Sequence, residues 1–322
     1  MVKVKVLMGY SLFVLSLLFI GVAHLGSLAE FAQLYYFDLL RNLYIQLLVC
    51  ALFTLAALMF FNKKIATIGF GILFIVIVFL NKSQQMTPPE KPNHTLQVVQ
   101  ANIRYYNPTI KDVYRSLKNM NADIYVLFEV NDTTRNEFID LRDTYFDYGS
   151  LEIEGFPDGI GIISKYPIIK RTQHQIKLGN KRAVIIELDL LVGTEVLTII
   201  ALHPPSPRSL TDWHNRNNVL ARLQKLIEVE EHQTMTLVVA DLNTTPWSYY
   251  FPNNPHFNSC YEQLGHYVTW LPIDYTPLYS WLVGLPIDHC LFSEGLRISE
   301  LQTHVVKGSD HLSISYTVSM LP

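Results

Sequence analysis

A carboxylate and an amide follow an apolar run in the sequence: residues 237–240 lead into Asp241 and Asn243, and then into a Thr-Thr-Pro turn. Such a run predicts a buried strand that ends near the aspartate. Because side chains alternate along a strand, groups two residues apart point the same way. Together they can hold a hard cation and a phosphate oxygen. An Asx turn closing the strand is the alternative, since Asp and Asn are ordinary turn residues.

Polar side chains also stand at the ends of other predicted strands. They are Asn102, Glu129, His203, the pair Asp288-His289 and the pair Asp310-His311. Singly, each has a plain explanation as a turn former, a solvated group or a buried histidine. As a set they supply oxygen ligands for Mg²⁺, imidazoles that titrate near neutral pH, and a spare carboxylate to orient one of them. We therefore expect these side chains to converge on one sheet edge.

The region after residue 95 alternates between strand and helix patterns that could position these groups. Strands are predicted over 96–102, 123–130, 160–163, 184–191, 196–203, 237–240, 288–292 and 312–319. Helices are predicted over 110–120, 133–145 and 210–229. Hairpins mixed with helices indicate an α/β sandwich with partly antiparallel sheets.

The N-terminal part is different, because the chain is 49% hydrophobic and 16% charged and the apolar excess lies there. Residues 6–29, 42–62 and 65–81 each approach the roughly 20 apolar residues that span a bilayer. We expect three transmembrane helices, making residues 1–81 a membrane anchor. A cleaved signal peptide is the alternative for the first segment only.

Basic residues predict the orientation of this anchor. Lys3, Lys5, Lys63 and Lys64 flank the predicted spans on one side, which is expected to be cytoplasmic. Everything after residue 81 is then outside the cytoplasm. Residues 82–95, rich in Pro, Lys and Gln, predict a linker, and residues 96–322 one domain.

The cysteines permit two interpretations. Cys260 and Cys290 could pair in an oxidising compartment. Cys290 lies in an apolar run, however, which favours a buried free thiol over a disulfide.

Seven motifs together carry a family resemblance. They are QANIR (100–104), FEV (128–130), DGIGIISKYP (158–167), ALHPP (201–205), ADLNTTPWS (240–248), PIDH (286–289) and GSDH (308–311). Over residues 96–320 the chain resembles the endonuclease/exonuclease/phosphatase superfamily, which includes deoxyribonuclease I-like nucleases. The resemblance implies a four-layer α/β sandwich with the site at one edge of two central sheets. Ala240 replaces a common Gly and Phe128 a frequent Gln, but neither change removes a ligand.

The resemblance also implies roles for individual residues. Glu129 resembles the principal ligand of a Mg²⁺ or Mn²⁺ ion, with Asn102, Asp310 and Asp241 near the same ion. Three pairs are implied around the phosphate: Asp288 orienting His311, Asp241 and Asn243 positioning the attacking water and phosphoryl oxygens, and His203 with Asp158 as a second histidine pair. Whether Asp241 or His311 takes the proton from water stays open.

The expected function is that of a metal-dependent phosphodiesterase, anchored in a bacterial inner membrane with its catalytic domain outside the cytoplasm. A nuclease-type activity is expected first, and hydrolysis of phospholipid or sphingomyelin headgroups is the alternative. After residue 81, acidic residues outnumber basic ones, which argues against tight nucleic-acid binding but not against a metal-dependent hydrolase. An inactive, membrane-tethered binding protein would be expected to lack site residues. A transporter would be expected to carry charges within its spans, and these spans carry none.

Overall fold

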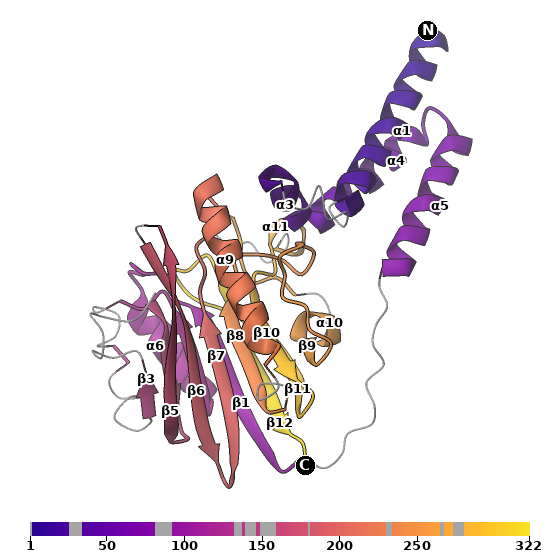
Figure 1. Ribbon diagram of the computed structural model, residues 1–322. Helices are drawn as coiled ribbons and strands as arrows, with labels where there is room; N and C mark the ends of the chain where they lie inside the picture. The colour runs from indigo at the N-terminus through magenta and orange to yellow at the C-terminus, as the bar shows by residue number, and fades with distance from the viewer. Residues whose placement is uncertain are drawn as a thin grey trace. The chain divides into compact units, whose positions relative to one another are not determined.

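The computed structural model describes residues 2–25, 34–80, 92–131, 137–138, 146–148, 159–179, 181–229, 234–264, 267–272 and 280–322. The chain divides into two compact units. One comprises Met1–Gln85 and Thr245–Phe251, and the other comprises Met86–Thr244 and Pro252–Pro322. The first is built from helices, and the second carries both β-sheets (Figure 1).

The first sheet of the second unit has the strand order β11-β12-β1-β2-β4-β3. Its strands are β1 (His94–Asn102), β2 (Ile124–Phe128), β3 (Phe146–Tyr148), β4 (Gly161–Ser164), β11 (Leu296–Val305) and β12 (Leu312–Met320). β1 and β2 pair in parallel, whereas the other neighbours pair antiparallel. Helix α6 (Ile110–Met120) makes the connection between the two parallel strands.

The second sheet has the order β5-β6-β7-β8-β10-β9. Its strands are β5 (Ile168–Leu178), β6 (Lys181–Val192), β7 (Glu195–Leu202), β8 (Thr236–Asp241), β9 (Phe257–Ser259) and β10 (Asp288–Ser293). Here β7 and β8 are the parallel pair, connected through α9 (Leu210–Ile227). Ser209 caps α9 by accepting the Asp212 N–H at 3.1 Å.

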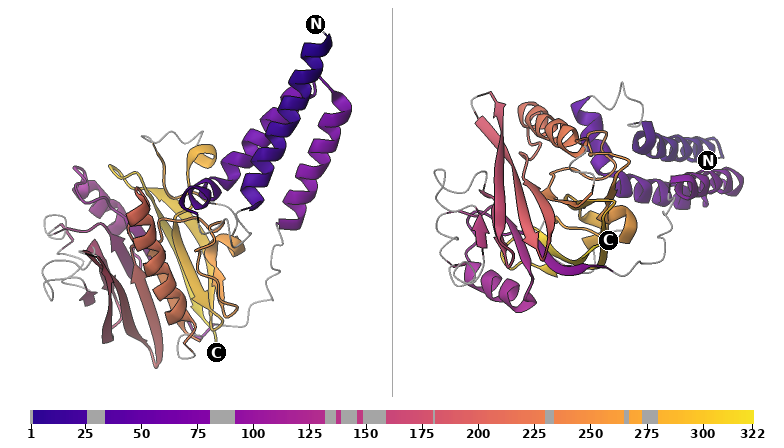
Figure 2. Two further views of the ribbon diagram at one scale, coloured as in Figure 1. Left: turned by 45° about the horizontal axis from the view of Figure 1, so that its top comes forward. Right: turned by 60° about the horizontal axis from the view of Figure 1, so that its bottom comes forward.

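Alternating side chains create the layers. Val98 and Val126 belong to the core between the two sheets, whereas Val99 and Tyr125 pack with residues of α6 on the other face of the first sheet. Seen along the strands, α6 and α9 lie on opposite outer sides of the paired sheets (Figure 2, right). The predicted α/β sandwich of two mixed sheets flanked by helices is therefore confirmed.

Most predicted elements are present; of the strands that sequence analysis missed, β3 and β9 have only three residues each, and the two long ones are polar. β5 reads IIKRTQHQIKL and β11 reads LRISELQTHV, both half-exposed outer strands with weak apolar alternation. The predicted helix over 133–145 lies outside the described residues except for a turn at 137–138.

The expectation of a free thiol at Cys290 is wrong. Cys260 and Cys290 form a disulfide with a Cα–Cα distance of 5.5 Å, and both residues are fully buried. The register of β9 with β10 pairs Ser259 with Leu291, which places the next residue, Cys260, opposite Cys290. A strand of three residues has too little pattern to reveal this pairing from sequence.

The helical unit contains α1 (Val2–Leu25), α3 (Tyr35–Asn42), α4 (Tyr44–Leu58) and α5 (Lys63–Leu80). A small buried cluster joins α1, α4 and α5 through Ile20, Ala51, Leu55, Leu58, Ala66 and Leu73. Among the described residues, no single helix is both long and apolar enough to cross a membrane. The pair α3 and α4 meets that test jointly, with a 73° bend between them. Of the predicted linker, residues 82–91 lie outside the described part, and His94 and Thr95 already belong to β1.

Candidate active site

The predicted site residues lie at the ends of the central strands. β1 ends at Asn102 and β8 at Asp241, while Glu129 and His203 directly follow β2 and β7. β10 begins at Asp288, which is paired in register with Asp241 because β8 and β10 are antiparallel. Both sheets thus bring polar side chains to one edge of the sandwich.

Asp241 contacts more of the predicted site residues than the other carboxylates at this edge described below. One carboxylate oxygen accepts a hydrogen bond from Asn102 Nδ2 at 3.0 Å and lies 3.5 Å from His203 Nε2 and 3.8 Å from His311 Nδ1. The other oxygen accepts the Asn243 N–H at 3.1 Å, which is an Asx turn. The turn and the site role are therefore compatible, and Asp241 is only 1% exposed.

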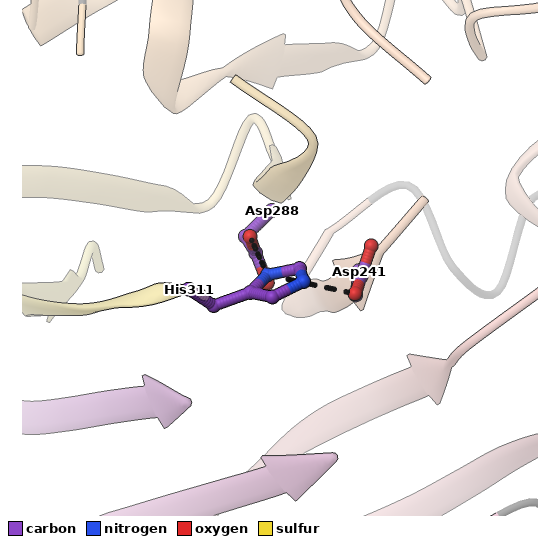
Figure 3. Close-up of side chains that lie close together, drawn as sticks. All are labelled: Asp241, Asp288 and His311. Carbon is purple, nitrogen blue, oxygen red and sulfur yellow. Dashed lines mark hydrogen bonds and ion pairs between the residues drawn. The ribbon is translucent and has the colours of Figure 1, made fainter. Parts of the chain in front are cut away.

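His311 and Asp288 form a buried pair (Figure 3). The distance from His311 Nδ1 to the Asp288 carboxylate is 2.9 Å, and the Asp288 N–H is bound by Thr269 Oγ1 at 3.0 Å. Burial disfavours the charged imidazole, but the nearby carboxylates of Asp288 and Asp241 outweigh it and raise the pKa of His311 to about 10. His311 is consequently protonated at neutral pH.

Glu129 and Asn102 form the other side of the site. Glu129 accepts hydrogen bonds from Asn102 Nδ2 at 3.0 Å and from the Tyr105 N–H at 3.1 Å. Since Asn102 Nδ2 also binds Asp241, a single amide group bridges the two carboxylates. Asn102 Oδ1 accepts the Arg104 N–H at 3.0 Å, which fixes the orientation of the amide.

Three residues at this edge have left-handed backbone: Arg104 (φ 63°), Glu129 (φ 60°) and Asn243 (φ 49°). Such a conformation costs about 1–3 kcal/mol for a residue other than glycine and persists only where the surroundings enforce it. Asn243 therefore leaves the alternation of β8, and its side chain donates to the Pro204 carbonyl at 3.0 Å. Because β8 ends at Asp241, strand alternation does not determine the direction of the Asn243 side chain, contrary to the expectation from the sequence.

Asp310 lies on the open side of the site. Its carboxylate accepts a hydrogen bond from Trp270 Nε1 at 3.0 Å. With His311 and Arg104 it lines a cavity of about 480 Å³.

Arg216 is a buried residue that sequence analysis missed. Its guanidinium donates to the Asn243 carbonyl at 3.1 Å and to Asn217 Oδ1 at 2.8 Å and 3.0 Å. It thereby holds the turn after β8. The signal was available, because Arg216 occupies the same side of α9 as Trp213 and Leu220, where a charge needs a buried partner.

Asp158 and His289 are the remaining residues named by the sequence analysis. Asp158 lies outside the described residues. His289 points away from Asp288 along β10, and its Nε2 contacts the Thr244 carbonyl at 2.9 Å. Burial lowers the pKa of His289 to about 4 despite that carbonyl, so it is neutral at pH 7.

Asp241, Asp288 and His311 have ligand atoms within 4.8 Å of one another and form a candidate metal group among the described residues. A metal requires a neutral imidazole, however, whereas these carboxylates stabilise the protonated one. Glu129 offers an oxygen ligand whose hydrogen-bond partners are an amide and a backbone N–H, and Asp241 lies close to it because both carboxylates bind the same amide nitrogen at 3.0 Å. Hard donors of this kind suit Mg²⁺ or Mn²⁺.

Several solved structures share the fold. TDP2 of D. rerio complexed with a single strand DNA product is 15% identical (TM-score 0.56) and covers 71% of this chain and 100% of that chain. An endonuclease/exonuclease/phosphatase of Beutenbergia cavernae is 17% identical (TM-score 0.55; coverage 71% and 72%). A beta toxin of Staphylococcus aureus is 18% identical (TM-score 0.51; coverage 69% and 99%).

Sequence comparison gives the family. No curated protein matches the chain. The model of the Endonuclease/Exonuclease/phosphatase family matches residues 99–311, about two thirds of the chain, which includes every site residue from Asn102 to His311. The chain therefore belongs to the endonuclease/exonuclease/phosphatase family, whose members are metal-dependent hydrolases of phosphate ester bonds.

Proposed function

We propose that the protein is a membrane-anchored phosphodiesterase of nuclease type, dependent on Mg²⁺ or Mn²⁺ and acting outside the cytoplasm. The contacts of Asp241 carry this proposal. Asp241 touches the Asn102 amide on one side and both imidazoles, His203 and His311, on the other. These contacts support a cation site next to a proton-donating group, which hydrolysis of an anionic ester requires.

Glu129, Asp241, Asn102 and Asp310 are the residues that would hold the metal ion. The ion supplies charge neutralisation for the phosphoryl group when bound. Glu129 is fixed for this role by the Tyr105 N–H and the Asn102 amide, despite its left-handed backbone.

His311 acts as a charged hydrogen-bond donor in this proposal. The Asp288 carboxylate forms a hydrogen bond with Nδ1 of His311, so the N–H at Nε2 is the one that would donate to a phosphoryl oxygen. Despite its burial, the nearby carboxylates of Asp288 and Asp241 raise the pKa of His311 to about 10, which favours a proton donor over a proton acceptor at neutral pH. In this proposal Asp241, whose carboxylate lies 3.5 Å from His203 Nε2, is the group that takes the proton from the attacking water.

The substrate is expected to be a nucleic acid, in line with the DNA product bound to the similar TDP2 structure. Hydrolysis of phospholipid or sphingomyelin headgroups is the second candidate. The aromatic side chains of Trp247 and Tyr249, the latter 48% exposed, favour it because such residues prefer the membrane interface.

Two observations support a location outside the cytoplasm. The apolar helices of residues 1–81 are flanked by lysines on one side. The buried Cys260–Cys290 disulfide is also typical of an oxidising compartment.

The test is hydrolysis by the full-length chain in detergent with Mg²⁺, on DNA, RNA, sphingomyelin, glycerophospholipids and phosphomonoesters. We expect turnover of a phosphodiester that EDTA abolishes and that His311→Ala reduces about 10²-fold or more. Turnover of none of these substrates, or turnover unchanged by EDTA, contradicts the proposal. Preference for a lipid over DNA selects the second candidate.

A further inference from the structure

Helix α3 has its polar and apolar sides reversed relative to a helix on a water-exposed surface. Asp38 and Asn42 are buried, whereas Tyr36, Leu40 and Leu43 at its end are exposed, Tyr36 by 74%. At about 100° per residue, the three apolar side chains fall on one side of the helix and the two polar ones on the opposite side. An outward apolar side is favourable where the surroundings are apolar.

The buried polar side of α3 binds the segment Thr245–Phe251, which belongs to the same unit. The Asp38 carboxylate accepts a hydrogen bond from the Ser248 hydroxyl. Asn42 Oδ1 accepts the N–H of Thr245 at 2.7 Å, while its Nδ2 donates to the Asp38 carbonyl at 2.7 Å. The segment thus satisfies polar groups that would be costly to bury alone.

Two neighbours of these residues bind Trp247 in the same segment. The Arg41 guanidinium donates to the Trp247 carbonyl. The ring of Tyr44, the first residue of α4, stacks on the indole with centroids 5.2 Å apart. Four residues, three in α3 and one at the start of α4, therefore contact the segment.

The held segment directly continues the active-site turn. Thr245 lies two residues beyond Asn243, whose carbonyl is bound by Arg216. Thr244 between them accepts a hydrogen bond from His289, the neighbour of Asp288. A displacement of the Thr245–Phe251 segment would consequently also shift the backbone of the turn that contains Asn243.

Lipid is the occupant that the apolar side of α3 fits. α3 and α4 are separated only by Leu43 and pass the test for a membrane span together, although they are bent by 73°. The other helices of the unit also expose large apolar side chains, among them Phe53 (68%), Phe60 (90%) and Phe74 (68%). A helix with one strongly apolar side, next to such a span, is typical of the membrane interface.

We propose that α3 lies in the membrane interface with Tyr36, Leu40 and Leu43 toward lipid, and that Asp38 and Asn42 are positioning residues that hold the Thr245–Phe251 segment. The positioning role rests on the proposed hydrolase function, and the lipid contact rests on the proposed membrane anchor but not on the hydrolase activity.

Spin labels on the full-length chain test the lipid contact. A Cys50→Ala background removes the free thiol, and Cys260 and Cys290 are blocked by their disulfide. Labels at Leu40→Cys and at Arg115→Cys, an exposed control on α6, are compared in vesicles of phosphatidylethanolamine and phosphatidylglycerol. We expect residue 40 to be several-fold more accessible to oxygen than to a water-soluble nickel chelate, with the reverse at residue 115. Equal, water-like values at both positions overturn the lipid contact.

Amide hydrogen exchange tests, without any substrate, whether Asp38 holds the Thr245–Phe251 segment in place. Asp38→Ala is expected to raise exchange over residues 245–251 about tenfold or more in the same vesicles. Asp38→Asn keeps an acceptor for Ser248 and should stay close to wild type, as should the surface control Glu294→Ala. Unchanged exchange in Asp38→Ala overturns the hold.

Kinetics test the positioning role. We expect Asp38→Ala and Ser248→Ala each to lower kcat about tenfold with little change in KM. The double variant should lose no more activity than the worse single variant. Asp38→Asn should have a rate close to that of the wild type. Wild-type rates in Asp38→Ala, together with increased exchange, overturn positioning. Should the wild-type chain hydrolyse no phosphodiester at all, the proposed function fails, while accessibility and exchange still decide the lipid contact and the hold.

Discussion

The two parallel strand pairs of the sandwich have the same connectivity and supply different chemistry. β1-α6-β2 brings Asn102 and Glu129 to the edge, and β7-α9-β8 brings His203 and Asp241. In both, the ends of parallel strands meet at one edge, as is usual for a βαβ unit. The difference lies in the partners: Asp241 is surrounded by imidazoles, whereas Glu129 is bound by an amide and a backbone N–H.

This difference indicates a division of labour. Neutral donors leave the negative charge of Glu129 in place, so that side of the site attracts a cation. The β8 side pairs its carboxylates with His203 and His311 and so prepares a positively charged donor. The repeated topology provides the edge, and the residue types at the strand ends determine what each half does there.

Removing the negative charge of Glu129, which the β1-α6-β2 unit supplies, should have the largest effect on turnover. Glu129→Gln keeps the shape and one of the two hydrogen-bond acceptors but removes the negative charge, so turnover should fall about 10³-fold, consistent with the several kcal/mol that a metal ion supplies. The measurement is kcat against Mg²⁺ concentration. Glu195→Gln, at the start of β7 and so at the opposite end of that strand from His203, is the control. Activity at the wild-type level in Glu129→Gln would remove the metal from this half of the site.

Disrupting the Asp288–His311 pair on the β8 side of the site should lower turnover somewhat less. Asp288→Asn and His311→Ala are each expected to lower kcat about 10²-fold. The double variant should lose little beyond the worse single one, since residues that act as a unit are non-additive. Losses that multiply in the double variant would show that Asp288 and His311 act independently.

Loosening the turn after β8 should have a smaller effect. Arg216→Lys loses the planar fork that joins Asn217 and the Asn243 carbonyl, so we expect kcat to fall about tenfold. Arg222→Lys, on the exposed side of the same helix, is the matched control. Equal rates for the two variants would reduce Arg216 to a residue that only packs.

The smallest effect concerns protonation rather than rate. NMR titration of His311 in the metal-free protein should give a pKa near 10, and Asp288→Asn should lower it. A folded-state pKa above the usual 6.5 stabilises the fold below that value, and this contribution is lost as pH rises through about 10. The stability difference between wild type and His311→Gln should therefore shrink from pH 8 to pH 11. A pKa of His311 below 7 would instead permit it to act as the base.

The sequence by itself predicted the buried central elements of the sandwich better than its outer strands. Buried strands such as β8 and the amphipathic α6 and α9 follow from strong apolar periodicity, because their packing requires it. β5 and β11 escaped detection because one side of each is solvated, and their polar residues carry no alternation. The Cys260–Cys290 disulfide depends on a register between short strands, which local patterns do not encode.

For the site, the sequence by itself provided the residue types and their order, since the motifs from Asn102 to His311 place donors and acceptors at strand ends. Tertiary structure decided which of them meet. The 2.9 Å contact of His311 with Asp288, the bridging of Glu129 and Asp241 by one amide, and the role of Arg216 all join residues far apart in the chain. The physical reason is that alternation fixes which face a side chain takes within its own strand, whereas its partners depend on sheet order and on left-handed turns such as that at Asn243.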